Sequence, residues 1–461
     1  MVFFLIILSF FSFLNIIYSY YFDITLSVNT YTITFFITLL IGFILIFFKK
    51  FDFSELKVFD KILVVLSGYL FLPFFIAIPY YLSIHNISIL NCYFEAISGF
   101  TSTGFTIIEN IKQIDPSLVI WRSTSQWIGG LYFLFSILLL IDIFDENLKK
   151  SLTNFLSLNS KEVIRQAFKI IVIYISLTII IFFILSIINI RTFDSFNLSM
   201  TLISSGGFMP ANSIDAILEN DIQKVTISIL MLVSFFSLFF IYNLITFNKN
   251  NLNYLSEDFN LLIYILVLIS LFFVLFNNEQ NFSNILLSIS SSVSNIGISS
   301  NNISSNLSFL FLILVIIGGS FFSTSSGLRF VKVLSLIRYS LNNLLSHANP
   351  NQVYLNKISL LNTNTNITDI NKYFLAILIF ILSLFTITFL LTISGIEFEN
   401  SFRIGILTIM NTVNSEMYQL PNFDFFNLNG FSKIFLILFM IIGRLELLSI
   451  LILFKKFLFK N

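Results

Sequence analysis

The sequence is poor in the residues on which most enzymes and metal sites depend. Its 461 residues include one cysteine, Cys92, and two histidines, so an internal disulfide framework and a cysteine-based metal site are excluded. A membrane enzyme would need His, Asp or Cys clustered at one depth, and few such residues are present. No GxxxxGK[ST] nucleotide-binding motif occurs, and the net charge of +1 without a large Lys/Arg cluster argues against nucleic acid as a partner. We therefore expect no catalytic residues and no covalently bound cofactor.

Charged residues are also scarce, at 11% of the chain, whereas hydrophobic residues make up 57% and phenylalanine alone occurs 60 times. With a mean hydropathy of +0.93, these values predict a multi-pass membrane protein. A spanning helix needs roughly 20 apolar residues, so the chain has room for about ten. The first apolar run, Val2–Tyr20, lacks the basic leading region and cleavage site of a signal peptide. We expect it to be a retained helix in the lipid bilayer.

Basic residues gather on every second connection between the apolar runs, which predicts that both termini are cytoplasmic. Four further apolar runs are too short to cross a bilayer, and this orientation places all of them on the outer side. They cover residues 91–103, 194–205, 281–293 and 398–410. A single run of this kind would indicate an interfacial helix or loop packing. Because each of the four precedes a polar elbow and another long apolar run, we interpret them as re-entrant pore helices.

The four polar elbows share small polar residues, and three of them contain glycine at the same step. They read TSTGF (101–105), SSGGF (204–208), SNIGI (294–298) and, more weakly, NTVNS (411–415). We take Gly104, Gly207, Gly297 and Asn414 as equivalent positions. Glycine reaches φ > 0 and leaves a lumen open, so carbonyl groups can replace the water shell of a cation. Half-helices entering from outside also direct their partly negative carbonyl ends toward the membrane centre.

Longer motifs resemble one known family. FEAISGFTSTGFT (94–106) followed by WRSTSQWIGG (121–130) is similar to the first pore helix, filter and following helix of the Trk/Ktr/HKT potassium transporters. GGSFFSTSSGLRFVKVLSLIR (318–338) resembles the interrupted helix of their third repeat, and GRLELLSILILF (443–454) their last helix. The resemblance covers nearly the whole chain and is closest to the bacterial TrkH-type membrane subunit.

The resemblance implies an all-α integral membrane protein with four pseudo-symmetric helix–pore-helix–helix repeats around one pore, preceded by two additional transmembrane helices. The corresponding segments are 1–55 for the two additional helices, then 56–150, 151–250, 251–345 and 346–461 for repeats 1 to 4. The implied filter residues, two from each elbow, are Thr103, Gly104, Gly206, Gly207, Ile296, Gly297, Val413 and Asn414. The fourth elbow departs from the family pattern, which leaves the choice between K⁺ and Na⁺ open. No metal other than the filter cation is expected.

Several polar residues interrupt the apolar spans. The segment 318–327 is either a small-residue helix contact or a flexible constriction, and the resemblance implies an intramembrane gating loop. The implied gate residues are Gly318, Gly319, Ser323, Thr324, Ser325, Gly327 and Arg444. Arg444 either forms an ion pair with Glu446 or Glu95, or faces the permeation path and opposes cation flow. Glu95 is alternatively a support behind the filter, and both histidines are expected at the surface.

These observations favour potassium uptake across the bacterial inner membrane, by channel-like or symporter-like conduction without covalent chemistry. A sodium or weakly selective transporter of the same fold is the alternative, and an ion-coupled solute carrier is less favoured because its inverted repeats are missing. The resemblance further implies a homodimer that binds a cytosolic, Rossmann-type, nucleotide-binding regulatory subunit similar to TrkA or KtrA.

Overall fold

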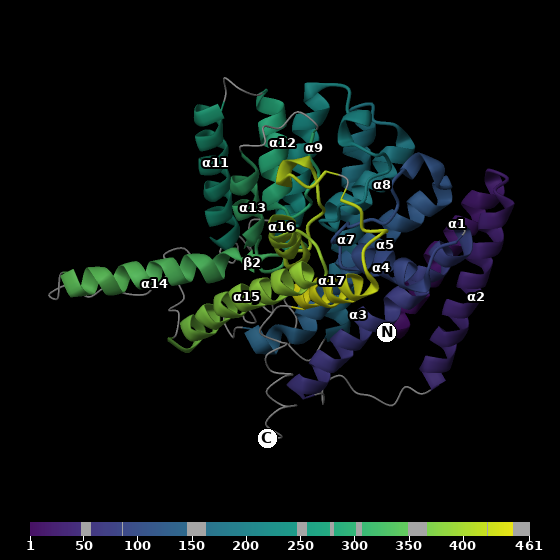
Figure 1. The fold of residues 1–461 in the computed structure, drawn as a ribbon, viewed down its shortest axis with the longest axis horizontal. Helices are drawn as coiled ribbons and strands as arrows, with labels where there is room; N and C mark the ends of the chain where they lie inside the picture. Colours follow the sequence, from purple (N-terminus) through teal and green to yellow (C-terminus); the bar gives the residue numbers. More distant parts are fainter. Residues whose placement is uncertain are drawn as a thin grey trace.

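The computed structural model describes residues 1–47, 57–84, 86–144, 163–246, 256–276, 281–300, 307–348, 367–421 and 423–445. Helices make up most of this part of the chain, and seven of them are long and apolar enough to cross a membrane. The chain begins with a helical hairpin, α1 (Val2–Tyr21) and α2 (Thr25–Phe47), which packs against α3 and α5 at one side of the molecule (Figure 1). These are the two additional helices that the resemblance implied.

Four units follow, each with a long helix, a twelve-residue helix and a third helix that is broken in two of the units. The first unit contains α3 (Val58–Ser83), α4 (Ile89–Phe100) and α5 (Pro116–Phe144). The second contains α7 (Val163–Ile187), α8 (Thr192–Ile203), α9 (Asp221–Met231), η4 (Leu232–Ser234) and α10 (Leu238–Thr246). The third contains α11 (Ser256–Phe276), α12 (Phe282–Val293), α13 (Ser308–Ile316) and α14 (Phe330–Ala348). The fourth contains α15 (Ile367–Ile393), α16 (Phe398–Ile409) and α17 (Gly430–Arg444). The exact borders of the five segments stay predictions.

The four twelve-residue helices α4, α8, α12 and α16 coincide with the four short apolar runs. At a rise of 1.5 Å per residue, each is about 18 Å long, which is too short for a hydrocarbon core of roughly 30 Å. Short one-turn helices lie in the connections on the same side: η2 (Ile111–Gln113), η3 (Ile214–Ala216) and η7 (Glu416–Tyr418). The inner ends of the twelve-residue helices are buried, so the elbows that follow them lie inside the molecule.

Two of the third helices are interrupted by non-helical backbone. In the third unit, α13 ends at Ile316 and α14 starts at Phe330, as the polar segment 318–327 predicted. Strands β1 (Ile317–Gly318) and β2 (Leu328–Arg329) pair in parallel at the two ends of this interruption, and α14 then projects away from the body (Figure 1). In the second unit, the apolar run 223–247 is long enough for a single span, but its helix breaks between α9 and α10.

These two interruptions also explain why fewer than ten helices qualify as spans. Neither α9 and α10 nor α13 is long enough alone. The last apolar run of the sequence, 431–455, is described only as far as residue 445, so the rest of it lies outside the described residues. The core is formed where the long helices pack around the four short ones, with tightly buried aromatic side chains such as Trp121, Tyr69 and Tyr174 between them.

Candidate ion pathway

The four elbows have one backbone conformation in common. Each short helix is followed by a capping residue and then by a residue with positive φ, namely Ser102, Ser205, Asn295 and Asn411 at +57°, +51°, +60° and +49°. In elbow 1, Ser102 N donates to Gly99 O at 2.9 Å and Thr103 N donates to Ser98 O at 2.9 Å. The same pair of bonds recurs in the other three elbows, which makes each a Schellman cap. This shared motif fixes the structural equivalence of the elbows residue by residue.

The equivalence changes the matched position in the fourth elbow. Gly104, Gly207 and Gly297 each lie two residues after the positive-φ residue, and the residue two positions after Asn411 is Val413. The assignment of Asn414 as the position equivalent to the three glycines is therefore wrong by one residue. The side chain of Asn414 instead donates from Nδ2 to Leu420 O at 3.3 Å.

The glycines of three elbows and Val413 of the fourth meet at one place. A Cβ atom added to Gly104 would lie 2.9 Å from Gly207 Cα and 3.0 Å from Val413 Cβ. A Cβ atom added to Gly297 would lie 2.5 Å from Val413 O. Both Gly104 and Gly297 also have φ near +80°, which disfavours any other residue. Four segments separated by about a hundred residues each thus converge on a common centre, with backbone in close approach.

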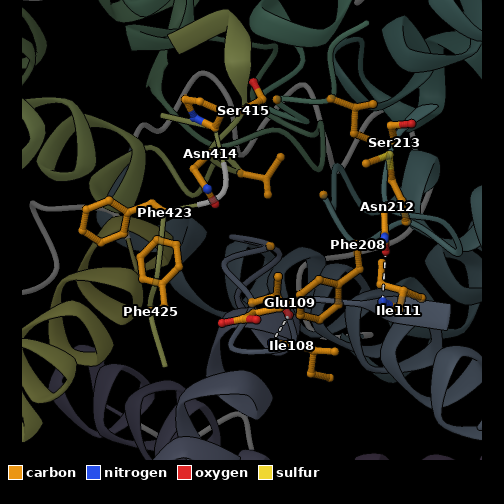
Figure 2. A pocket seen from close by; sticks show the side chains of 18 of the residues that line it. Ile108, Glu109, Ile111, Phe208, Asn212, Ser213, Asn414, Ser415, Phe423 and Phe425 are labelled. Carbon is orange, nitrogen blue, oxygen red and sulfur yellow. Dashed lines mark hydrogen bonds between the residues drawn. The ribbon is translucent and has the colours of Figure 1, made fainter. Parts of the chain in front are cut away.

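A cavity of about 520 Å³ opens directly from this centre. Figure 2 shows residues of the first, second and fourth units around it, among them Glu109, Phe208 and Asn414. Gly104, Gly207, Gly297 and Val413 all contribute to its lining. Three acidic residues, Glu109, Glu416 and Asp424, lie along the same cavity. The cavity therefore joins the meeting point of the elbows to a surface that carries negative charge.

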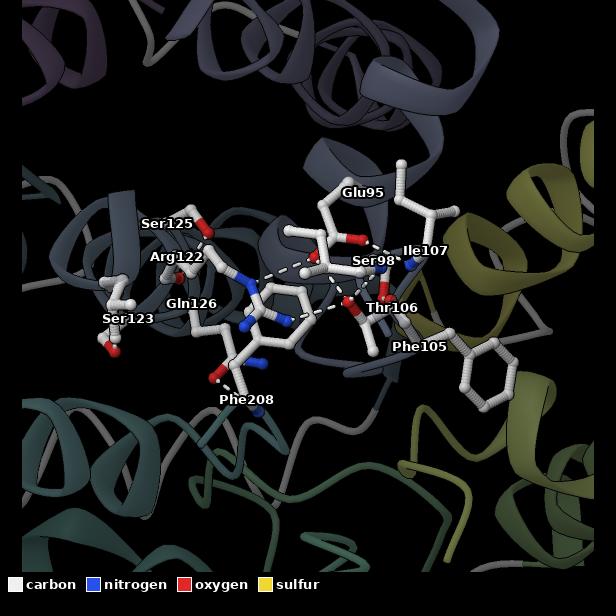
Figure 3. Close-up of polar contacts among 12 residues, drawn as sticks. Glu95, Ser98, Phe105, Thr106, Ile107, Arg122, Ser123, Ser125, Gln126 and Phe208 are labelled. Carbon is white, nitrogen blue, oxygen red and sulfur yellow. Dashed lines mark hydrogen bonds and ion pairs between the residues drawn. The ribbon is translucent and has the colours of Figure 1, made fainter. Parts of the chain in front are cut away.

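Behind elbow 1, a buried ion pair holds the backbone in place. Glu95 of α4 is completely buried and accepts a hydrogen bond from Arg122 Nε at 3.1 Å. Its other oxygen accepts from Ile107 N at 2.9 Å, and Thr106 Oγ1 donates to Glu95 at 3.0 Å (Figure 3). Glu95 thus lies where a support for elbow 1 was expected. Arg122 itself is buried within α5.

Arg122 also links elbow 1 to elbow 2. Its guanidinium group lies 4.1 Å from the ring centroid of Phe208, and its Nη2 donates to Thr106 at 2.9 Å. The neighbouring Gln126 accepts a hydrogen bond from Phe208 N at 3.2 Å (Figure 3). Side chains of α5 therefore orient two adjacent elbows at once.

The left-handed asparagines connect the remaining elbows. Asn411 Nδ2 donates to Thr103 Oγ1 at 3.0 Å and to Met440 O at 2.9 Å, so it joins elbow 4 to elbow 1 and to α17. Asn295 Nδ2 donates to Val315 O at 2.9 Å and contacts Thr412 at 3.3 Å. These side chains satisfy buried backbone groups that would otherwise be costly at membrane depth.

The segment between β1 and β2 lies directly beneath the elbows. Thr324 Oγ1 donates to Ile203 O at 2.7 Å, at the end of the second short helix, and Ser205 Oγ donates to Thr324 O at 2.9 Å. Ser326 Oγ donates to Asn411 at 3.2 Å. Residues 318–326 are all buried, and Gly327 is half-buried with φ at +84°. We call residues 318–327 the intramembrane loop.

Arg329 and serine side chains hold the loop in its folded form. Arg329 Nη1 donates to Ser320 O at 3.0 Å and to Ser325 O at 3.1 Å. Ser323 and Ser325 share a hydrogen bond of 2.9 Å, and Ser325 also accepts from Gly319 N at 3.1 Å. The expected gate residues from Gly318 to Gly327 therefore form one connected unit. The alternative of a small-residue contact between two regular helices is wrong, because the backbone of this segment is not helical.

The break between α9 and α10 provides a platform for the loop. Ser320 N donates to Phe235 O at 3.0 Å, Ser325 N to Ser234 O at 3.1 Å, and Leu238 N to Phe322 O at 3.3 Å. The two interrupted helices thus satisfy each other's backbone groups. No local signal predicts the break between α9 and α10, because SFFS (234–237) contains neither glycine nor proline.

Arg444 lies next to both the loop and elbow 1. It is buried and donates to Ser326 Oγ and, at 3.3 Å, to Ser102 Oγ. Its guanidinium group is 4.1 Å from the ring centroid of Phe133, and Arg329 lies 5.3 Å from the same ring. The expected alternative of an ion pair with Glu95 is wrong, because Glu95 binds Arg122. The other proposed partner, Glu446, lies outside the described residues.

Comparisons with known proteins agree with this architecture. No family model matches the chain. An uncharacterized cation transporter of Methanocaldococcus jannaschii is 26% identical over 434 residues, covering 88% of this chain and 85% of that protein. The Trk system potassium uptake protein TrkH of Escherichia coli strain K12 is 25% identical over 448 residues, covering 92% and 91%. The crystal structure of the potassium transporter TrkH from Vibrio parahaemolyticus matches with a TM-score of 0.82 and 21% identity, covering 97% of this chain and 96% of that one.

Over nearly its whole length, the chain is similar to TrkH-type proteins of the Trk/Ktr family. Its all-α membrane fold is confirmed by the shared architecture with a solved TrkH structure. Sequence reasoning missed Arg122, Asn411 and the platform at Ser234 and Phe235. Glu95 could have predicted the burial of Arg122, since a buried carboxylate needs a partner of opposite charge. The Ser-x-Gly and Asn-x-Gly sequences of the first three elbows could have predicted that Asn411 takes the same left-handed position as Ser102, Ser205 and Asn295.

Proposed function

We propose that this chain carries potassium into the cell through the meeting point of the four elbows, with the intramembrane loop as its gate. The convergence of Gly104, Gly207, Gly297 and Val413 is the observation that carries the proposal. Each elbow follows the carbonyl end of a buried twelve-residue helix, where the helix dipole is partly negative and favours a cation. Relatives that match over nearly the whole chain are named as potassium uptake proteins and a cation transporter.

The path runs from the acidic cavity through the elbows to the intramembrane loop. Support for the filter in the first three elbows comes from Gly104, Gly207 and Gly297, which lie where the elbows meet. The loop closes the route beneath, since its hydrogen bonds to Ile203, Ser205 and Asn411 hold it against the inner face of the elbows. Movement of the loop is required for a cation to pass, and Arg444 adds a positive charge at that point.

Further properties of the proposal come from family likeness. The protein lies in the bacterial inner membrane with both termini in the cytoplasm, forms a homodimer, and binds a cytosolic Rossmann-type nucleotide-binding subunit similar to TrkA or KtrA. Transport needs no catalytic residue and no bound cofactor. A sodium or weakly selective transporter is the second candidate, and Val413 at the fourth filter position is the observation that favours it.

Flux measurements in liposomes test the proposal. The purified chain is expected to carry K⁺ down its gradient, and Gly104→Asp is expected to abolish this flux, because Gly104 has φ +83° and no room for a side chain. Gly430→Asp is the matched control. Gly430 is exposed at the start of α17, its nearest neighbour is Leu90 Cδ2 at 3.5 Å, and a negative charge suits a helix N-terminus. Normal flux in Gly104→Asp would refute the filter.

Shortening the loop tests the gate separately. Deletion of Ser323, Thr324 and Ser325 removes the hydrogen bonds from the loop to Ile203 and to Ser234. We expect a several-fold rise in passive K⁺ flux with the filter left in place. An unchanged flux in a protein that elutes as the wild type does would show that the loop is not the barrier.

A further inference from the structure

The side chain of Val413 lies among the three filter glycines. A Cβ atom added to Gly207 would lie 2.4 Å from Val413 Cβ and 2.7 Å from Val413 Cγ1. Cβ atoms added to Gly104 and Gly297 would lie 3.0 Å from Val413 Cβ and 2.9 Å from Val413 Cγ1, respectively. One isopropyl group is therefore in close approach to three elbows at once. Val413 is half-buried and is one of the residues that line the outer cavity.

The polar groups next to Val413 are engaged elsewhere. The amide of Asn414 donates to Leu420 O, and the hydroxyl of Thr412 donates to Met410 O at 3.2 Å and contacts Asn295. Elbow 4 thus presents an apolar side chain at the level where the other elbows present bare backbone. A methyl group offers a cation no oxygen ligand, and a hydrophobic constriction excludes water from the lumen.

We infer that Val413 is the specificity-determining constriction of this pathway: its isopropyl group narrows the filter, limits cation flux and discriminates against larger cations. The inference rests on the proposed function, since it assumes that the elbows form the conducting path. The inference follows from two properties of the Val413 side chain, its size and its lack of polar atoms. Three glycines leave the lumen open on three sides, and the valine side chain occupies the space on the fourth.

A substitution series at this one position tests the inference by flux in liposomes. K⁺, Rb⁺ and Na⁺ are supplied singly, and flux is expected in the order Val413→Gly, Val413→Ala, wild type, Val413→Ile, from largest to smallest. The glycine variant should gain several-fold in K⁺ flux, and its Rb⁺-to-Na⁺ flux ratio should also rise several-fold. Equal flux and equal ratios across the series would overturn the inference, even if the wild type conducts K⁺.

The series separates this inference from the proposed function. If Gly104→Asp abolishes wild-type flux while the Val413 variants change nothing, the filter stands and the constriction is refuted. If well-folded Val413→Gly and wild type both carry no cation, both ideas fail. If only Val413→Gly conducts, the constriction is supported, whereas the wild type is not an open potassium path by itself.

The orientation of the side chain is tested without measuring flux. Val413→Cys in a Cys92→Ala background provides a single thiol, and native Cys92 is buried at 1% exposure. A small cationic thiol reagent is expected to label Cys at 413 through the outer cavity, and Glu416→Cys is the positive control, because Glu416 lines the same cavity and is exposed. Labelling at 416 without labelling at 413 would overturn the inference, since Val413 would then face away from the path. This readout remains available if Val413→Gly folds poorly.

Discussion

Two buried arginines near the elbows differ in one respect that decides their roles. Arg122 of α5 and Arg444 of α17 are each about 1% exposed, and each guanidinium group lies 4.1 Å from the ring centroid of a phenylalanine. Arg122 has a carboxylate partner in Glu95. Arg444 donates to the hydroxyl groups of Ser326 and Ser102, and none of the ion pairs among the described residues includes it. A neutralised charge can brace a filter, whereas an uncompensated one acts on any cation nearby.

The physical reason lies in the cost of a buried charge. Desolvation of an ion costs several kcal/mol, which a paired ion recovers in part and a single ion does not. The Glu95–Arg122 pair therefore contributes a fixed geometry with little net field. Arg444 keeps its field, and its neighbours are the intramembrane loop and elbow 1, both on the proposed path. We expect substitutions at the first site to change stability and those at the second to change transport.

The largest effect is expected from breaking the pair. Glu95→Gln leaves the guanidinium of Arg122 buried without a counter-charge, which should cost about 3–5 kcal/mol of stability. Thermal unfolding of the purified protein in detergent measures the loss. In the double variant Glu95→Gln/Arg122→Gln both charges are gone, and part of the stability should return. A double variant no more stable than the single one would contradict a pairwise brace.

The next effect concerns flux. Arg444→Gln removes a positive charge beside the loop, so K⁺ flux is expected to rise several-fold, with a smaller loss of stability than Glu95→Gln. Arg444→Lys keeps the charge and should retain low flux. Liposome flux and thermal unfolding of the same preparations provide both readouts. Lower flux with a large loss of stability in Arg444→Gln would make Arg444 a structural residue like Arg122.

A smaller effect is expected from a single hydroxyl group. Ser326→Ala removes an acceptor for Arg444 and a donor to Asn411, which should cost on the order of 1 kcal/mol and raise flux less than Arg444→Gln does. Ser335→Ala is the matched control. Ser335 is also a buried serine, and its hydroxyl makes no hydrogen bond within the described part of the chain. Equal effects of the two substitutions would show that Ser326 does not act through its polar contacts.

The smallest effect is expected at an exposed ion pair on α16. Arg403 contacts Glu399 one turn earlier on α16, and the Glu399 side chain is 74% exposed. Exposed pairs are worth a few tenths of a kcal/mol, so Glu399→Gln should shift the unfolding temperature hardly at all. A loss comparable to that of Glu95→Gln would mean that burial is not what distinguishes the pairs.

Much of the fold could be predicted because its signals are local. The four short apolar runs became α4, α8, α12 and α16, since run length alone separates a half-helix from a spanning helix. The loop at 318–327 was also predictable, because its glycines and serines interrupt an apolar run. The break at 234–237 was not, since phenylalanine and serine have no strong preference against helix. It exists because the loop of another unit supplies its hydrogen bonds.

The residues of the candidate site were also predictable only where their signal was local. Gly104, Gly207 and Gly297 were predictable, because glycine is selected wherever backbone must approach backbone. The fourth position was not, since NTVNS allows two registers that differ by one residue. The burial of Arg122 was not predicted, because nothing in its local sequence shows which segment packs against it. Only the approach of α4 to α5 places it beside Glu95.

By itself, the sequence determined that this chain is a helical membrane protein with four repeated half-helix elements, because hydropathy and helix length act within each segment. The tertiary structure decided that Val413 lies among the three elbow glycines, that Arg122 is paired, and that Arg444 stays beside the loop without a carboxylate among the described residues. These outcomes depend on distances between residues far apart in the chain, which packing fixes and local sequence does not.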